Sequence, residues 1–277
     1  MAELARRLSR FFIFAHIGCL NMKLKTVLLL SSLLLGNWVN AEPLRIVSEE
    51  WPPFIYAENG HIKGADKDVT EYLLSQLGYQ VEWSLMPWRR VLREAEDGSA
   101  DAILDIAPHP THLKTYLFTD EPLSSHETML FYAMDRPLAY RNIDDLSGLV
   151  VGVSPGYLYN NHQFVTSDAF RREPAPTFEA NLQKLVRGRV DLVAMSRPVG
   201  VYISRALGID HRVSYHPIPL SHSEFYLVFN RTSTWKEPAR AFSQALKAFK
   251  KTDAYSHILR QYHLESVDGK LTLATPD

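Results

Sequence analysis

The sequence alternates short apolar strands with amphipathic helices, and this alternation constrains the fold more than any other feature. Residues 43–50, 80–86 and 100–107 are predicted strands, and residues 64–79 and 87–98 between them are predicted helices. In the first helix the apolar side chains recur at helical spacing, and a glycine ends the run. Strands that alternate with helices predict a parallel sheet with helices on its faces.

The same alternation starts again in the second half of the chain. Residues 149–153 are a predicted strand, a Pro-Gly turn and a helix start follow, and residues 178–196 repeat the order helix, glycine, strand. The segments "GSADAILDI" and "GRVDLVAMS" occupy equivalent places in the two halves. Each half therefore predicts an α/β unit with a mostly parallel sheet of its own.

Two extended, alternating segments connect the halves, and they predict a hinge. Residues 126–134 lead out of the first half and residues 224–230 lead back, after a histidine-rich segment at 215–224 that predicts a loop. The last amphipathic segment, 237–265, predicts one helix that closes the first lobe. The expected fold is thus a two-lobed α/β protein with lobe one at 42–130 plus 225–277 and lobe two at 131–224.

The N-terminus has the pattern of a cleaved signal peptide rather than of a folded element. After Met22 come two lysines, an apolar run from Val27 to Leu35, and a small-residue site that predicts cleavage after Ala41. The apolar run is shorter than the roughly 20 residues that span a bilayer. Residues 1–41 are therefore expected to be an N-terminal extension and a leader, which predicts a soluble, exported protein, in the periplasm.

Composition excludes several classes of function. Without residues 1–41 the chain has 25 basic and 30 acidic residues, a net charge of −5, which argues against a nucleic-acid partner. Cys19 is the only cysteine and lies in the predicted leader, so the mature chain has neither a disulfide nor a thiolate nucleophile. We expect the protein to be a monomer and to bind no cofactor.

Six motifs in order resemble the family 3 bacterial extracellular solute-binding proteins, the amino-acid type of ABC-transporter receptor. They are "WPPF" with "GADKD" (51–54 and 64–68), "PWRR" (87–90), "LFTDEPL" (117–123), "DLSGLVVGVSPG" (145–156) and "GRVDLVAMS" (188–196). The resemblance covers the whole mature chain. It implies the type 2 periplasmic-binding fold, in which two lobes close on a small solute, and an inner-membrane ABC permease as partner.

Ligands of α/β sheets bind beyond the carboxyl ends of the strands. Here those ends are 49–51, 106–107, 154–156 and 195–197. Gly156 precedes a predicted helix start, whose free backbone N–H groups suit an anionic ligand group. The candidate ligand-binding residues are Glu50, Trp51, Arg90, Ala107, His112, Gly156, Tyr157, Ser196 and Arg197.

The sequence departs from the family where amino-acid binders hold their ligand. The arginine that grips the α-carboxylate is replaced by His112 or, in the alternative alignment, by Leu113. The acidic residue that holds the ligand ammonium is replaced by Ser196, and a threonine near Gly156 is replaced by Tyr157. Because a zwitterion would leave its charges unpaired, we expect a ligand other than an ordinary α-amino acid, such as an aromatic or carboxylate-bearing solute.

Each candidate also has a structural alternative. His109 and His112 would need a third ligand to hold a metal, and the flanking prolines argue against a helix that aligns them, so a position on the cleft rim or the surface is expected. Trp51 suits the core or a ligand contact, and Arg90 suits the cleft or an ion pair with Glu94. Arg197 suits the cleft or the lobe surface.

Two further functions remain open beside the receptor. Relatives that resemble this family dehydrate cyclic acids with a cleft carboxylate, and Glu49, Glu50 and Asp105 are the carboxylates near predicted strand ends. No nucleophile–base motif is present, so an enzyme is not expected. A sensor module that signals to a membrane kinase would have the same sequence features as a transport receptor. Asp66 and Asp68 are expected to cap their helix.

Overall fold

A computed structural model describes residues 42–231, 233–267 and 270–273, so the predicted leader lies outside the described residues. The first lobe begins with β1 (Leu44–Ser48), β2 (Tyr56–Glu58), β3 (His61–Lys63), α2 (Ala65–Gln76), β4 (Val81–Leu85), α3 (Trp88–Glu96), β5 (Ala102–Ile106), α4 (Pro110–Thr115) and β6 (Tyr116–Phe118). The long strand β7 (Ser124–Ala133) leads out of it.

The second lobe contains β8 (Val150–Val153), α5 (His162–Thr166), β9 (Arg171–Pro174), α6 (Phe178–Val186), β10 (Leu192–Ser196), α7 (Arg197–Ala206) and β11 (Val213–Tyr215). The chain returns through β12 (Ser221–Asn230) and ends with α8 (Lys236–Phe249), α9 (Asp253–Gln261), β13 (Leu264–Val267) and β14 (Lys270–Leu273). None of the helices in this described part of the chain is long and apolar enough to cross a membrane.

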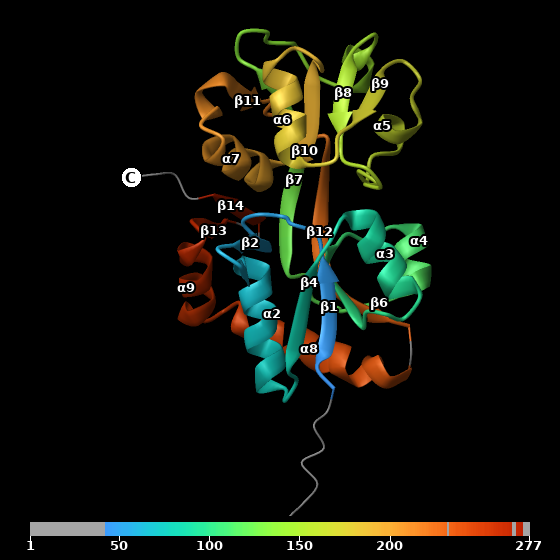
Figure 1. The fold of residues 1–277 in the computed structure, drawn as a ribbon, viewed down its shortest axis with the longest axis vertical. Coiled ribbons are helices and arrows are strands. Elements are labelled where there is room, and N and C mark those ends of the chain that lie inside the picture. Colours follow the sequence, from blue (N-terminus) through green and yellow to red (C-terminus); the bar gives the residue numbers. More distant parts are fainter. Residues whose placement is uncertain (1–41, 232, 268–269, 274–277) are drawn as a thin grey trace, which may run out of the picture. The chain divides into compact units, whose positions relative to one another are not determined.

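One sheet runs through both lobes in the order β4-β1-β5-β12-β7-β10-β8-β9 (Figure 1). Strands β4, β1 and β5 are parallel to one another, and so are β10, β8 and β9. The returning strand β12 is antiparallel to both β5 and β7. The two mostly parallel half-sheets and the two connecting strands confirm the predicted fold class.

Strands β7 and β12 change partners along their length. Residues 124–128 of β7 pair with 221–225 of β12, whereas 128–132 of β7 pair with β10. The second half of β12 pairs with β5 and β6. We propose Leu130 and Phe225 as the boundaries of the lobes, because β7 passes from β12 to β10 at Thr128, just before Leu130, and β12 passes from β7 to β5 directly after Phe225.

The turn between β1 and α2 is tightly packed. The Trp51 N–H donates to the Ile55 carbonyl at 2.6 Å, and the Phe54 carbonyl accepts from Asp66 and Lys67 in the first turn of α2. Gly64 ends this turn with φ 139°, and a Cβ placed on it would lie 2.1 Å from the Phe54 carbonyl oxygen. Only glycine fits here. The turn therefore fixes Trp51 against the start of α2.

Three local expectations from the sequence were wrong. The helix expected over 237–265 is two helices, because the Thr252 side chain caps α9 by accepting from the Tyr255 N–H at 3.3 Å, and a hairpin of β13 and β14 follows. Residues 221–224 belong to β12, where pairing with β7 overrides the polar composition. The third expectation was that Asp66 and Asp68 cap α2. Instead, Asp66 accepts from the Ser124 hydroxyl and Asp68 from the Tyr262 hydroxyl, and neither caps the helix.

Candidate functional site

A cavity of about 80 Å³ lies where the carboxyl ends of β1, β5, β8 and β10 meet, and both lobes line it. Six of the nine residues proposed from the sequence line this cavity: Trp51, Ala107, His112, Gly156, Tyr157 and Ser196. The side chains that sequence reasoning did not propose as ligand contacts are Ser48, Glu49, Trp88, Asp105, His109, Thr128, Ser154, Leu158, Tyr159, Asn160, Phe178, Ala194, Met195, Ser223 and Phe225.

The other three candidates are not among the residues that line this cavity. Glu50 is exposed and borders a second, larger cavity beside the first. Arg90 points to solvent and forms an ion pair with Glu94 at 2.7 Å, which is the surface alternative. Arg197 lies with one guanidinium nitrogen 3.9 Å from a Glu127 carboxylate oxygen, beside the cavity rather than in its wall.

Glu49 connects the lobes through a hydrogen bond. It follows β1 directly, and its carboxylate accepts from the hydroxyl of Tyr157, which lies in the turn after β8. Burial raises the pKa of Glu49 to about 7, although the tyrosine hydroxyl opposes this shift. Burial and the neighbouring carboxylate raise the pKa of Tyr157, which therefore stays a phenol and donates. Glu49 thus changes charge near neutral pH.

Asp105 is the most unusual group in the wall. It is only 8% exposed, its backbone has φ 65°, and its hydrogen-bond partner is the carboxyl group of Asp66, with no N–H, alcohol or phenol donor of the described residues within reach. Its neighbour Asp66 is also buried and accepts from the Ser124 hydroxyl at 2.5 Å. Burial and the Asp66 charge raise the pKa of Asp105 well above its usual range, so Asp105 holds a proton when no cation lies beside it.

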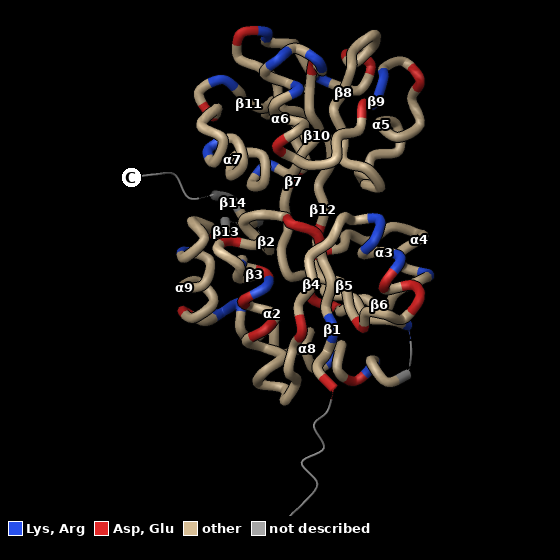
Figure 2. Tube along the Cα trace, in the orientation of Figure 1, with Lys and Arg blue, Asp and Glu red and all other residues tan. Residues whose placement is uncertain are grey.

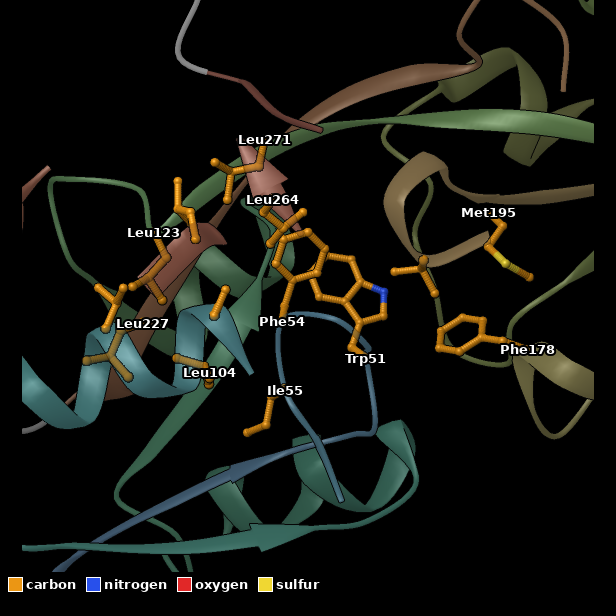
Figure 3. Close-up of a cluster of buried hydrophobic side chains, with 14 of the residues drawn as sticks. Trp51, Phe54, Ile55, Leu104, Leu123, Phe178, Met195, Leu227, Leu264 and Leu271 are labelled. Carbon is orange, nitrogen blue, oxygen red and sulfur yellow. The ribbon is translucent and has the colours of Figure 1, made fainter. Parts of the chain in front are cut away.

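Aromatic rings form much of the remaining wall. Trp51 packs against Phe54 and Phe225 with ring centroids 5.0 and 4.6 Å apart, and Tyr157 lies 6.2 Å from both Trp88 and Phe178. The buried indole N–H of Trp51 has no hydrogen-bond partner in the described residues. Figure 3 shows this nitrogen on the side of the ring that faces Phe178 and Met195. Trp51 is therefore both a core residue and part of the cavity wall.

The two histidines of "PHPTH" have structural roles. His109 caps α4, because its Nδ1 accepts from the Thr111 N–H at 3.3 Å, and Pro110 occupies the first turn of that helix. A helix thus forms despite the prolines, but His109 lies outside it, as the N-cap residue, and only His112 lies within it. His112 donates from Nδ1 to the Ala107 carbonyl at 3.1 Å, and burial lowers its pKa. No group of three potential metal-ligating side chains exists among the described residues.

His126 lies behind the cavity wall and was not singled out from the sequence. Its ring stacks on Phe54 and Phe225 at 4.5 and 4.4 Å, and its nitrogens lie 3.3 Å from the hydroxyls of Ser124 and Ser196. Burial lowers its pKa to about 3, so the ring is neutral. A neutral imidazole thus fixes the hydroxyl of Ser196, which lines the cavity.

Comparison with known proteins agrees with this geometry. Residues 44–265 match the bacterial extracellular solute-binding proteins, family 3. The chain belongs to this family. A curated relative is the probable amino-acid-binding protein YxeM of Bacillus subtilis (strain 168), 24% identical over 221 residues, which are 78% of this chain and 81% of YxeM.

Two solved structures, of a sensor domain and of a substrate-binding protein, have the same fold as this chain. One is a histidine kinase sensor domain similar to periplasmic binding proteins, with a TM-score of 0.69, 19% identity, and coverage of 80% of this chain and 96% of that one. The other is AbpA of Streptococcus pneumoniae, an amino acid ABC transporter substrate-binding protein bound to L-arginine, with a TM-score of 0.69, 18% identity, and coverage of 79% and 94%.

The raised pKa of Glu49 predicts a measurable pH dependence of stability. Between pH 4.5 and about 7 the unfolded chain loses this proton while the folded protein keeps it. The free energy of unfolding should therefore fall by about 3 kcal/mol as pH rises through this window, and level off above it. Glu49→Gln should remove this component. Urea unfolding of both proteins at several pH values measures it.

The matched control is Glu50→Gln, because Glu50 is the exposed neighbour of Glu49. This variant should keep the pH dependence of the unchanged protein. Parallel pH profiles for the unchanged protein and Glu49→Gln would contradict the assignment of the titration to Glu49.

Proposed function

We propose that this protein is an exported receptor that captures a small polar solute in the cavity between its lobes and delivers it to an inner-membrane ABC permease. The observation that carries the proposal is that strand ends of both half-sheets build one wall, with the Tyr157–Glu49 hydrogen bond closing it. Release of a solute then requires the lobes to separate about β7 and β12, a hinge motion known in this kind of fold.

The relatives support a transport role. YxeM is named as a probable amino-acid-binding protein, and AbpA as part of an amino acid ABC transporter. The predicted cleavage after Ala41 supports export to the periplasm. The sensor-domain structure supports signalling to a membrane kinase as a second possible output of the same binding event.

The proposal predicts that a solute co-purifies with the protein or stabilises it. The protein should be isolated from the periplasm under native conditions and its ligand identified by mass spectrometry after denaturation. Addition of that solute at 100 times its Kd should stabilise the protein by about 2.7 kcal/mol, which is several degrees in Tm.

The control is Ala107→Phe, which fills the cavity because Ala107 lines it. Stabilisation of the unchanged protein with none for the variant supports binding in this cavity. Equal stabilisation of both proteins places the solute elsewhere and contradicts the proposal.

One observation favours an enzyme of the dehydratase type as the second candidate, because a carboxylic acid with a pKa of about 7 suits general acid catalysis. Cyclic diacid substrates such as prephenate fit less well, since no lysine or arginine is among the described residues of the cavity wall. Turnover of prephenate that disappears in Glu49→Gln, with Glu50→Gln active, would favour this candidate over the receptor.

A further inference from the structure

We infer that the solute is an organic cation without a carboxylate, with its ammonium group beside Asp105 and its apolar part between the aromatic rings of the wall. This inference rests on the proposed receptor function and names the chemical class of its ligand. It reverses the sequence-based expectation of a carboxylate-bearing solute. Three separate observations support it: the acidic side chains of the cavity wall, the hydrogen-bonding capacity of Asp105, and the aromatic rings that line the cavity.

The cavity wall contains acidic side chains that a bound cation can ionise. Glu49 and Asp105 line the cavity, and the described residues of its wall include neither lysine nor arginine. The adjoining cavity, about 530 Å³, shares Glu49 and Trp88 with the first, and its wall contains Glu50 and Glu179 against a single arginine, Arg89. Figure 2 shows the acidic segment that directly follows β1. A cation is favoured beside such acids because it stabilises their ionised forms.

Among the described residues of the wall, no cationic side chain replaces the arginine that binds the α-carboxylate in amino-acid receptors, and the helix start expected after Gly156 is absent, since α5 begins only at His162. His112 is the candidate for that position, and its Nδ1 already donates to the Ala107 carbonyl. Burial and the nearby His109 lower the pKa of His112, so its imidazole is neutral. A ligand carboxylate would enter a cavity that holds two acids and no cation, which is unfavourable unless a charge partner enters with it.

Asp105 supplies the acceptor that an ammonium group needs. The proton of Asp105 is directed to Asp66, which also accepts from Ser124, and the Asp105 oxygens accept from no donor of the described residues. Buried acceptors without partners are rare, and one at a cavity wall indicates that the missing donor arrives with a ligand. An alkylammonium has three N–H donors and a charge opposite to that of the aspartate, so it satisfies both requirements.

The aromatic rings supply the second feature of a cation site. Trp51, Trp88, Tyr157, Phe178 and Phe225 all line the cavity. Aromatic faces attract ammonium groups, and desolvated sites strengthen this attraction. The unpartnered indole N–H of Trp51 is a donor, so the cation should also carry a neutral acceptor such as a hydroxyl, ether or amide oxygen.

Binding of a cation should displace the proton of Asp105. Without a cation Asp105 is protonated; beside an ammonium group the carboxylate form is favoured, and the proton leaves to solvent. The titratable groups around it are Asp66 on α2, Glu49 after β1, Tyr157 after β8, and His109 and His112 at α4, with Lys250 acting on Asp66. Amine affinity should therefore rise with pH.

Pairs of compounds that differ only in a carboxylate test the inference. Calorimetric titrations at pH 8 should compare tyramine with tyrosine, histamine with histidine, agmatine with arginine, and cadaverine with lysine. We expect at least one amine to bind, at least tenfold more tightly than its amino acid. The same titration at pH 7 in buffers of different ionisation enthalpy should report net release of protons.

Asp105→Asn is the decisive variant, since asparagine tolerates the positive φ of this position and keeps the shape of the side chain. It should lower the affinity for the amine at least tenfold, while Asp168→Asn, on an exposed loop of the second lobe, should leave it unchanged. Proton release is measured on the unchanged protein, so it still tests the inference if Asp105→Asn fails to fold.

The outcomes separate this inference from the proposed function. If amino acids or neutral solutes bind and amines do not, or if Asp105→Asn binds the amine as tightly as the unchanged protein, the cation assignment is overturned and the receptor stands. If no amine of the panel binds, the cation assignment is likewise overturned. The receptor function itself is judged by the co-purified ligand and the Ala107→Phe control.

Discussion

Replacing Trp51 with alanine should destabilise the protein by about 3 to 5 kcal/mol and abolish binding of its solute. Trp51 is 4% exposed and packs against Phe54, Phe225 and His126, so the truncation leaves a hole where the first lobe meets the hinge strands. Chemical denaturation measures the first effect, and calorimetric titration with the identified ligand measures the second.

Trp51→Phe is the matched control because it keeps an aromatic ring but loses the indole N–H. We expect it to retain most of the stability and to weaken binding only as far as that N–H contributes. If Trp51→Ala left the free energy of unfolding unchanged, the packing described for this turn would be wrong.

Replacing Gly64 with alanine should cost about 4 kcal/mol and prevent correct formation of the turn that holds Trp51. Its backbone has φ 139°, and the new Cβ would lie 2.1 Å from the Phe54 carbonyl oxygen, so both backbone strain and overlap oppose the change. The free energy of unfolding and the near-ultraviolet circular dichroism of the tryptophans report the two effects.

Gly60→Ala is the control that separates the backbone strain at a positive φ from the overlap of the new Cβ with neighbouring atoms. Gly60 also has a positive φ, 79°, but no described atom lies within 4 Å of the position that a Cβ would take there. It should cost about 1 kcal/mol, the strain alone. Equal losses for the two glycines would mean that the Phe54 carbonyl can move away, and that the turn is less rigid than its hydrogen bonds indicate.

Most of the fold follows from local periodicity, and this is why the sequence predicts it well. Strand β5 is a run of apolar residues between two helices, and β7 and β12 alternate along a hinge. One error arose where distant contacts decide. Residues 221–224 look like a loop until β7 pairs with them. Another error was local, because Thr252 caps α9 and so divides a continuous amphipathic pattern.

The candidate site was only partly predictable. Strand ends can be located from the sequence, and this brought Trp51, Ala107 and Ser196 to the cavity. Which of two adjacent acids faces inward depends on the turn after β1, so Glu50 was chosen where Glu49 lines the wall. The signal for Asp105 was present, since an aspartate interrupts the apolar run "AILDI", but its pairing with Asp66 and the lack of a donor for its oxygens depend on contacts that no local pattern contains.

The position of two tryptophans in the wall has a practical consequence for optical experiments. Trp51 and Trp88 line the cavity, whereas Trp83 and Trp235 are not among its lining residues. Indole emission responds to the polarity and charge around the ring, and a solute that replaces water there alters both. The unlabelled protein therefore carries its own fluorescent reporter of occupancy, and Trp51→Phe together with Trp88→Phe would assign the signal to one ring or the other.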